Sequence, residues 1–221
     1  MLLADEYIKS HKYADHFIII ADVQTSARGR KGNDWSSEEG GLWCSLVLNH
    51  ISLHQSFTLY IGLCILKSLI EITKKYSFKI KWPNDIYLMD DKVCGLICSQ
   101  YQKYHKTSIG IGINTNNSKP LIENANSINN ILNVYIDNQI LLGVLIKNIF
   151  FDLHLFEAQG LSILLDYYQK YDFLLDKRIK VISGNDAHTG KYLGINNMGE
   201  LVLRNDKDIE QRIGAGTVIC M

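Results

Sequence analysis

Cationic side chains and glycines are gathered in one short loop of the sequence, residues 24–35, which reads QTSARGRKGNDW. Its cations are Arg28, Arg30 and Lys31, and they alternate with Gly29 and Gly32. Glycine lets the backbone adopt positive φ and turn its N–H groups inward, and consecutive inward amides form a concave anion site. Arginine adds a planar fork of donors that fits phosphate or carboxylate oxygens. The loop therefore predicts an anion-binding site; a solvated basic hairpin is the alternative.

A second stretch, residues 81–95, reads KWPNDIYLMDDKVCG and adds two lysines and three aspartates. Pro83 pushes Trp82 towards extended geometry and ends a strand there. Asp90 and Asp91 mark a hairpin turn between two further strands. If the fold brings this hairpin beside the basic loop, cations from both stretches can neutralise anionic groups in one pocket.

The overall composition narrows the class of protein. The 221 residues suffice for one large domain or a larger domain with a small appendage, and 47% of them are apolar, enough to bury a core. The 23 Lys and Arg balance the 23 Asp and Glu, so no overall basic field would recruit nucleic acid. No apolar run approaches the roughly 18 residues of a membrane span, and the first residues lack the order of a signal peptide. We therefore expect a cytoplasmic protein that binds neither nucleic acid nor membrane.

The cysteines and histidines predict neither a disulfide framework nor a metal site. The five cysteines are odd in number and mostly embedded in apolar patterns, which favours reduced core thiols. Neither C-x-x-C nor H-E-x-x-H occurs. His50 and His54 have helical spacing but stand in an expected connection, so no metal ligands are assigned.

Hydrophobic periodicity predicts the order of strands and helices. The continuous apolar run at 17–21 is typical of a buried strand, and the alternation at 42–48 is typical of a half-buried one. Residues 57–76 and 139–158 follow the helical period. Further strands are expected at 78–82, 86–89, 92–100 and 107–113, further helices at 4–12 and 160–171, and an asparagine-rich loop at 118–137. Strands that precede helices without regular alternation indicate an α+β domain with a mixed β-sheet.

After residue 171 the pattern changes to short strands separated by Gly, Asn and Asp turns. These strands are expected at 178–182, 190–195, 200–204, 208–212 and 217–220. Such even spacing is typical of a small barrel. We place the boundary near residues 174–177 and expect two domains, residues 1–174 and a small SH3-like β-barrel at residues 175–221.

Three motifs, in this order, resemble those of the biotin protein ligase family. The family's GRGRxGRxW loop is similar to residues 27–35 (ARGRKGNDW), and its KWPND hairpin with a following KxxG is similar to residues 81–85 and 92–95. A strand that ends in GIGxN is similar to residues 110–114 (GIGIN). Each motif alone is weak, but the combination is specific. The resemblance extends over the catalytic and C-terminal domains of the family and covers nearly the whole chain.

The resemblance implies a ligase that works in two steps. The carboxylate of biotin attacks the α-phosphate of ATP, which gives biotinyl-5′-AMP and pyrophosphate, with Mg²⁺ covering the departing pyrophosphate. A lysine amine of a biotin carboxyl carrier protein domain then attacks the acyl carbon and releases AMP. Biotin and ATP are thus the implied substrates, Mg²⁺ is the implied cofactor and the carrier domain is the implied partner. A homodimer is left open.

The same resemblance implies roles for individual residues. Arg30, Lys92 and Asp85 are the implied catalytic residues: the cations neutralise the reacting anions, and Asp85 orients or deprotonates the incoming amine. Trp35 matches an adenine-stacking tryptophan, and the loop at 25–35 would order over the reactive intermediate and exclude water. Biotin, ATP or the acyl-adenylate would be bound by Gln24, Arg28, Gly29, Arg30, Trp35, Asn84, Lys92, Gly95 and Asn114.

Each of these assignments has a simpler structural alternative. Gln24 could end a strand, Trp35 could fill the core and Lys92 could be a solvated hairpin lysine. The polar residues Asn84, Asp85 and Asn114 could form or cap turns. Lys81 is either structural or directed at phosphate, and it ranks below Lys92 as a candidate for charge stabilisation.

Three departures from the family pattern bear on ligand binding. Ala27 replaces the usual first glycine and requires a negative φ at that position. Asn33 replaces a common arginine, so ATP is expected to bind more weakly. The family's Ser-Thr-Asn segment would lie before Met1, so weaker biotin affinity and no N-terminal DNA-binding domain are expected for the chain as written.

Two other functions are kept as alternatives. A lipoate ligase or octanoyltransferase of the related group would share the fold and the carrier substrate. The tryptophan and proline of KWPND and the arginine-rich loop favour biotin, and pyrophosphate exchange driven by biotin or by lipoate would separate the two. The other alternative is a non-catalytic module that binds an adenylate or nucleic acid; such a module would bind nucleotide but label no carrier domain.

Overall fold

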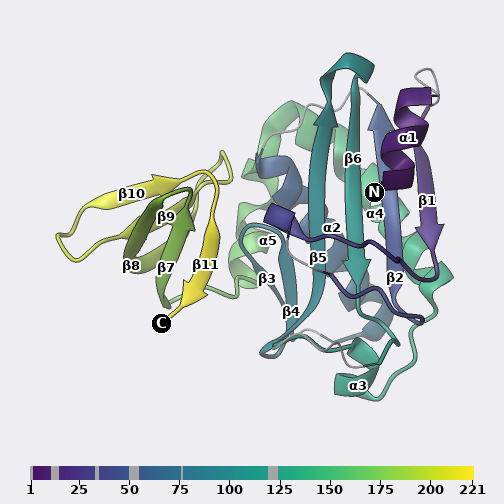
Figure 1. Cartoon of the computed structure of the whole chain (residues 1–221). Coiled ribbons are helices and arrows are strands. Elements are labelled where there is room, and N and C mark those ends of the chain that lie inside the picture. Colours follow the sequence, from purple (N-terminus) through teal and green to yellow (C-terminus); the bar gives the residue numbers. More distant parts are fainter. Residues whose placement is uncertain (1, 11–14, 33–34, 50–54, 76, 119–123) are drawn as a thin grey trace.

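Six strands form the main sheet of the computed structural model, which describes residues 2–10, 15–32, 35–49, 55–75, 77–118 and 124–221 (Figure 1). Their order is β1-β2-β6-β5-β4-β3. The bounds are β1 Phe17–Ala21, β2 Leu42–Asn49, β3 Phe78–Lys81, β4 Asp85–Leu88, β5 Asp91–Tyr101 and β6 Lys106–Ile113. The expected α+β class and the expected strands are confirmed. All neighbouring strands of this sheet are antiparallel, and parallel pairing among the described residues is confined to the bridges Ile80–Asp172 and Lys92–Ala125, so the sheet is not mixed.

Burial differs from the expectation in the first two strands. β2 is not half-buried but covered on both faces along almost its whole length. Its even-numbered residues join the main core, while Val47 packs against α1 (Leu2–Ser10) on the other face. β1 lies at the edge of the sheet and is not fully buried, since Ile20 is 53% exposed. A local apolar run does not reveal whether a strand has one neighbour or two.

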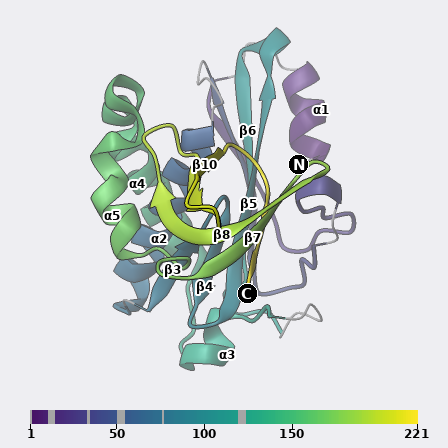
Figure 2. The same ribbon diagram turned by 90° about the vertical axis from the view of Figure 1, so that its left-hand side faces the viewer.

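Helices cover both faces of the main sheet (Figures 1 and 2). One face carries α2 (Gln55–Thr73), α4 (Asn138–Gln159) and α5 (Leu165–Lys170), and the other carries α1. The side chain of Asp137 accepts hydrogen bonds from two backbone N–H groups and caps the start of α4. Gly160, with φ of 66°, follows its end. The helix expected at 160–171 is a 3₁₀ turn (η3, Gly160–Leu164) continued by α5.

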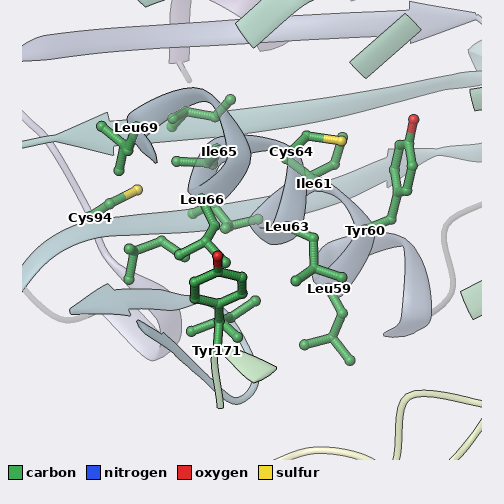
Figure 3. Packing of buried hydrophobic residues seen from close by; sticks show 14 of the residues in the cluster. Leu59, Tyr60, Ile61, Leu63, Cys64, Ile65, Leu66, Leu69, Cys94 and Tyr171 are labelled. Atoms are coloured by element: carbon green, nitrogen blue, oxygen red, sulfur yellow. The ribbon is translucent and has the colours of Figure 1, made fainter. Parts of the chain in front are cut away.

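The helix α2 forms the centre of the main core (Figure 3). Most of its leucines and isoleucines are almost fully buried, whereas Ile72 is partly buried, and fully burying such a side chain stabilises the fold by roughly 1.5–3 kcal/mol. Gly62 allows close approach to β3, because a Cβ there would lie 3.0 Å from the Cδ1 atom of Ile80. By length and composition alone, Ser56–Thr73 and Asn138–Lys170 could each cross a membrane. The first is mostly buried as a core helix, with 72% of its most apolar 18-residue window inside the protein, whereas 33% of the corresponding window in the second is buried.

The asparagine-rich segment before α4 is not entirely a loop. It contains the short helix α3 (Ile128–Leu132), begun by Ser127, whose side chain accepts from the Asn130 N–H group. Asn133, in the left-handed conformation, ends the helix. Five residues are too few to show a helical period in the sequence, so this turn was missed.

Five antiparallel strands form a second sheet at the C-terminal end, in the order β10-β9-β8-β7-β11 (Figure 1). Their bounds are β7 Arg178–Ser183, β8 Asp186–Ile195, β9 Leu201–Arg204, β10 Glu210–Ile213 and β11 Thr217–Cys220. All five expected strands are present. The sheet resembles a small barrel, but it is open, because β10 and β11 lie at opposite ends of the order. The expected boundary at 174–177 falls in the connection between the sheets, and the division into two domains stays a prediction.

Hydrogen bonds between described residues attach the C-terminal sheet to the main sheet and its turns. The Trp82 indole Nε1 donates to the Gly199 carbonyl at 2.9 Å, and the Arg30 guanidinium donates to the Gly216 carbonyl at 3.2 Å. The hydroxyl of Tyr192 in β8 donates to Asp172 Oδ2 at 2.6 Å. Asp172 itself follows α5 and bridges to β3, so Tyr192 and Asp172 form a polar junction between the two sheets.

Asp172 predicts a pH-dependent stability at this junction. Burial raises the pKa of Asp172 to about 6, although hydrogen bonds from Tyr192 and the Leu174 N–H group lower it in part. The folded state therefore holds a proton on Asp172 more tightly than the unfolded state does. Its contribution to stability is complete below about pH 4 and falls by about 3 kcal/mol as the pH rises to about 6. Chemical unfolding of the wild type and the Asp172→Asn variant between pH 4 and 7 measures this difference.

The matched control is Asp176→Asn, an exposed aspartate in the left-handed conformation four residues away. Its pH profile should follow that of the wild type, whereas the free-energy difference between wild type and Asp172→Asn should decrease with rising pH. A constant difference across this range would contradict the assignment.

Candidate active site

One row of directly opposed residues crosses all six strands and forms the floor of the site. Residues opposite each other in antiparallel strands point their side chains to the same face. The register pairs join the row into a single line from β1 to β3. Its members, in order, are Ala21, Trp43, Gly112, Gly95, Asp85 and Lys81. Residues from all three sequence motifs or their flanks therefore meet on one face.

The two glycines of this row leave space that Trp35 occupies. A Cβ atom on Gly112 would lie 2.8 Å from the Trp35 Nε1 atom, and one on Gly95 would lie 3.0 Å from its Cζ3 atom. Trp35 is half-buried and meets Trp43 edge-on, with ring centroids 6.5 Å apart. Its indole N–H is buried and has no acceptor in the described part of the chain. Trp35 is therefore not a fully buried core residue: its ring lies over Gly95 and Gly112, and its indole N–H has no acceptor among the described residues.

The turn between β3 and β4 holds the basic loop in place. Asn84 is buried and donates from Nδ2 to the Leu96 carbonyl at 2.9 Å. Its Oδ1 atom accepts from Arg30 Nη1 at 2.7 Å. Asn84 therefore connects β5 to Arg30 through hydrogen bonds from the two ends of its side-chain amide. The peptide bond between Trp82 and Pro83 in this turn is cis.

Arg30 is held by neutral oxygens rather than by a carboxylate. Its guanidinium donates to Asn84 and to the Gly216 carbonyl, which comes from the C-terminal part of the chain. Burial lowers the pKa of Arg30, and the nearby Asp85 opposes this in part. Arginine remains charged even so. The positive charge of Arg30 is thus oriented but not consumed by an ion pair.

Lys92 and Asp85 form an ion pair beside Trp35. The Lys92 Nζ atom lies 2.7 Å from Asp85 Oδ1 and 5.2 Å from the centroid of the Trp35 ring. The backbone of Lys92 is hydrogen-bonded to the segment that follows β6. Its N–H donates to the Asn124 carbonyl, and its carbonyl accepts from the Asn126 N–H. Both charged groups are half-buried. Lys92 is therefore fixed at the side chain and the backbone.

These groups line a single cavity of about 1100 Å³. Its charged lining residues have a net charge of +3. They are four cations (Arg28, Arg30, Lys81 and Lys92) and one carboxylate (Asp85). At the β1 and β2 end the lining is mostly apolar and includes Ile19, Ile20 and Ala21. Burial raises the pKa of the Cys44 thiol in this lining to about 12, so Cys44 stays protonated and does not act as a nucleophile. The cavity suits a molecule with an apolar end and an anionic end.

The structure places most of the expected site residues in this cavity. Gln24 lines it, and its Oε1 atom accepts from Ser37 Oγ at 2.7 Å. Arg28 and Gly29 line it as well, as does Ala27, whose φ is not positive, so its Cβ is tolerated. The expected residues within the lining are Gln24, Arg28, Gly29, Arg30, Trp35, Asn84, Asp85, Lys92 and Gly95.

Asn114 is not in the cavity lining. It is buried, its Oδ1 atom accepts from Asn117 Nδ2 at 3.2 Å, and its carbonyl accepts from the Ile128 N–H. These bonds fit the structural alternative of a turn, and a nucleotide contact by Asn114 stays a prediction. Asn33, His50 and His54 lie outside the described residues.

Several segments of the lining are not among the site residues expected from the sequence, including residues 2–4, 19–21 and 43–45. Asn124 and Ala125 come from the asparagine-rich region, and residues 216–218 come from the C-terminal sheet. Lys81 ranks below Lys92 by sequence alone, yet it is the last residue of the floor row. Only three residues separate Lys81 from Asp85, and this short spacing is the sequence signal that Lys81 lies beside Asp85 in the site.

Comparison with known proteins agrees with this geometry. Residues 1–116 match the family model described as the biotin/lipoate A/B protein ligase family. The chain is 30% identical over 207 residues to the bifunctional ligase/repressor BirA of Salmonella typhimurium, a match that covers 88% of this chain and 64% of that protein. BirA of Escherichia coli matches with the same identity and coverage. The chain therefore spans less than two thirds of the length of these curated relatives.

Solved structures share the same fold. The biotin protein ligase of Aquifex aeolicus in complex with biotin and ATP superimposes with a TM-score of 0.87 and 28% identity, covering 98% of this chain and 93% of that chain. The ligase of Leishmania major in complex with biotinyl-5-AMP shares the fold at a TM-score of 0.67 and 20% identity, covering 97% and 94%. The family expected from the three motifs is thus confirmed, and the chain belongs to the biotin/lipoate A/B protein ligase family.

Proposed function

We propose that this chain is a biotin protein ligase, which activates biotin with ATP and transfers it to a lysine of a biotin carboxyl carrier protein domain. One observation carries the proposal. Arg30 and Lys92, from separate motifs, reach one cavity through the neighbouring residues Asn84 and Asp85. The Aquifex aeolicus protein that shares this fold was solved with biotin and ATP.

The ends of the cavity suit the two substrates. Biotin has an apolar ring and chain that end in a carboxylate, and the cavity is apolar near β1 and β2 and cationic near Asp85. Its carboxylate would therefore point along the floor towards Arg30 and Lys92. The adenine of ATP is assigned to Trp35, whose indole N–H offers a donor that the described residues leave unused.

In the first step a carboxylate oxygen of biotin forms a bond to the α-phosphorus of ATP, and the bond from that phosphorus to the β-phosphate oxygen breaks. Two anions must meet, so their repulsion is the main barrier that the protein can reduce. Arg30 and Lys92 supply fixed positive charge at this point. Pyrophosphate leaves with the electron pair of the broken bond, and biotinyl-5′-AMP remains.

In the second step the amine of the carrier lysine bonds to the acyl carbon of biotin, and AMP leaves with the C–O electron pair. The amine must first lose a proton, because its pKa in water is about 10.4. Asp85 is the carboxylate of the cavity lining and is assigned to orient or deprotonate this amine. Asp85 also forms an ion pair with Lys92, so it holds in place the ammonium group that stabilises the first step.

The Asp85→Asn variant separates these roles. We expect transfer from pre-formed biotinyl-5′-AMP to a carrier domain to fall about 100-fold, while adenylate formation falls much less. Rapid mixing and mass spectrometry of the carrier domain measure transfer. If Asp85 is the base, raising the pH towards the pKa of the amine should recover part of the rate. Full adenylation with an unchanged transfer rate would rule out the base role.

The cavity does not fit a resident Mg²⁺ site. No group of three or more potential ligands from His, Cys, Asp and Glu occurs among the described residues, and Asp85 is already paired with Lys92. Mg²⁺ is bound readily by phosphate oxygens and water with few protein carboxylates. We assign Mg²⁺ to the ATP substrate complex, not to the protein.

Pyrophosphate exchange tests the choice of acid. The protein, ATP and labelled pyrophosphate are incubated with biotin or with lipoate, and the label that returns to ATP is counted. A biotin ligase exchanges with biotin and not with lipoate. Exchange with lipoate alone would support the lipoate-ligase alternative, and nucleotide binding without exchange would support a non-catalytic module. A cytoplasmic location is proposed with the ligase, because all five cysteines are free thiols.

A further inference from the structure

Lys81 differs from Lys92 and Arg30 because its ammonium group contacts neither a carboxylate nor an amide or carbonyl oxygen of a described residue. Lys92 is paired with Asp85, and Arg30 donates to two oxygens. Lys81 lines the same cavity and is half-buried, yet it forms no ion pair with any described residue. A half-buried charge without a counter-ion is costly unless a ligand supplies one.

Two aromatic rings hold the ammonium group of Lys81 without neutralising it. Its Nζ atom lies 3.4 Å from the Tyr87 hydroxyl and 5.1 Å from the centroid of the Tyr87 ring. It also lies 5.7 Å from the ring of Phe173, which stacks on Tyr87 at 4.4 Å. Burial lowers the pKa of Lys81, and the nearby Cys220 and Asp85 oppose this. The side chain is thus oriented beforehand.

The position of Lys81 along the floor suggests what it binds. The row runs from the apolar end through Gly95 and Asp85 to Lys81. Strands are about 4.8 Å apart, so Lys81 lies two strand spacings, roughly 10 Å, beyond Gly95. In phosphoryl transfer the attacking and leaving oxygens are roughly in line. If biotin approaches from the apolar end and reacts near Lys92, the leaving group departs towards Lys81.

We propose that Lys81 binds the β- and γ-phosphate oxygens of ATP and then the departing pyrophosphate. This inference rests on the proposed ligase function and adds a residue to its site. Lys92 and Arg30 act on the α-phosphate where the new bond forms, whereas Lys81 acts on the group that leaves. This assignment can be tested separately from the second step, because Lys81 would contact pyrophosphate but would take no part in transfer to the carrier.

Lys79 provides a matched control on the same strand. It is two residues before Lys81, so it lies on the same face of β3. It also stands over an aromatic ring, 5.9 Å from the centroid of Tyr171, but it donates to the Lys170 carbonyl and is absent from the cavity lining. If Lys81 only packs against an aromatic ring, replacing Lys81 or Lys79 should affect pyrophosphate binding equally. If Lys81 binds pyrophosphate, only its replacement should weaken that binding.

The test measures binding of inorganic pyrophosphate by calorimetry to the wild type and to the Lys81→Met, Lys81→Arg and Lys79→Met variants. A charge-assisted hydrogen bond predicts that Lys81→Met weakens this binding on the order of 10- to 100-fold. Lys81→Arg should recover most of it and Lys79→Met should change it less than about threefold. Transfer from pre-formed biotinyl-5′-AMP to a carrier domain should stay within about twofold in all variants, which also shows that they fold.

Two results would overturn the inference. Unchanged pyrophosphate affinity in Lys81→Met is one, and an equal loss of pyrophosphate binding and of transfer, which indicates general damage, is the other. Failure of the proposed function is separate, because then the wild type itself would show no biotin-dependent pyrophosphate exchange. If the wild type exchanges and Lys81→Met binds pyrophosphate normally, the ligase assignment stands and only the role of Lys81 fails.

Discussion

The Lys92→Met variant will form biotinyl-5′-AMP about 100- to 1,000-fold more slowly than the wild type, the usual effect of removing one preorganised charge from a reacting centre. Lys92 is fixed in the cavity through Asp85 at its side chain and through Asn124 and Asn126 at its backbone. Biotin binding should change only a few-fold, because the ring binds at the apolar end. Single-turnover mixing with biotin and ATP measures adenylate formation, and calorimetry measures biotin binding.

Removing Lys92 also leaves Asp85 without its partner, and the exposed carboxylate would repel phosphate. The double variant Lys92→Met with Asp85→Asn separates the two causes. If the lost cation is responsible, the double variant stays as slow in adenylation as Lys92→Met. Recovery to near the wild-type rate would show that Lys92 only neutralises Asp85, and the proposed role in charge stabilisation would be wrong.

The Arg30→Met variant should lower adenylate formation about 100-fold and release biotinyl-5′-AMP faster. Arg30 has two tasks, since it supplies charge and also joins the basic loop to Asn84 and to the Gly216 carbonyl. Losing these bonds frees the loop that carries Trp35. Rapid dilution of the complex with labelled biotinyl-5′-AMP measures its release.

Arg30→Lys is the comparison for this variant. A lysine keeps the charge but lacks the planar fork that reaches both acceptors. It should recover part of the adenylation rate while release of the intermediate stays fast. If both variants retain the intermediate as well as the wild type does, the contact between Arg30 and Gly216 has no part in holding the loop.

The sequence predicted the convergence of the main site residues because each motif is local. Asn84 and Asp85 are neighbours in one turn, and Lys92 and Gly95 belong to the start of one strand. Once the loop that carries Arg30 folds over this hairpin, its guanidinium can reach Asn84. Short-range spacing therefore accounts for the grouping within the hairpin, whereas the contact between Arg30 and Asn84 also requires the loop to fold over it.

Contacts between distant segments could not be predicted in the same way. The clasp around Lys92 by Asn124 and Asn126 depends on how the chain returns after β6, and no local pattern encodes it. Similarly, the Gly216 carbonyl reaches Arg30 only because the C-terminal sheet packs beside β3. The exposure of β1 has the same cause, since strand order is a property of the whole sheet.

The most direct test of the central claim is the complete reaction. The protein is incubated with biotin, ATP, Mg²⁺ and a biotin carboxyl carrier protein domain, and mass spectrometry of the carrier domain identifies the modified residue. Biotin on one lysine of the carrier, formed only when ATP is present, is the result expected from a cavity in which Arg30 and Lys92 neutralise the meeting anions. A carrier that remains unmodified in this mixture, but gains lipoate when lipoate replaces biotin, would contradict the account.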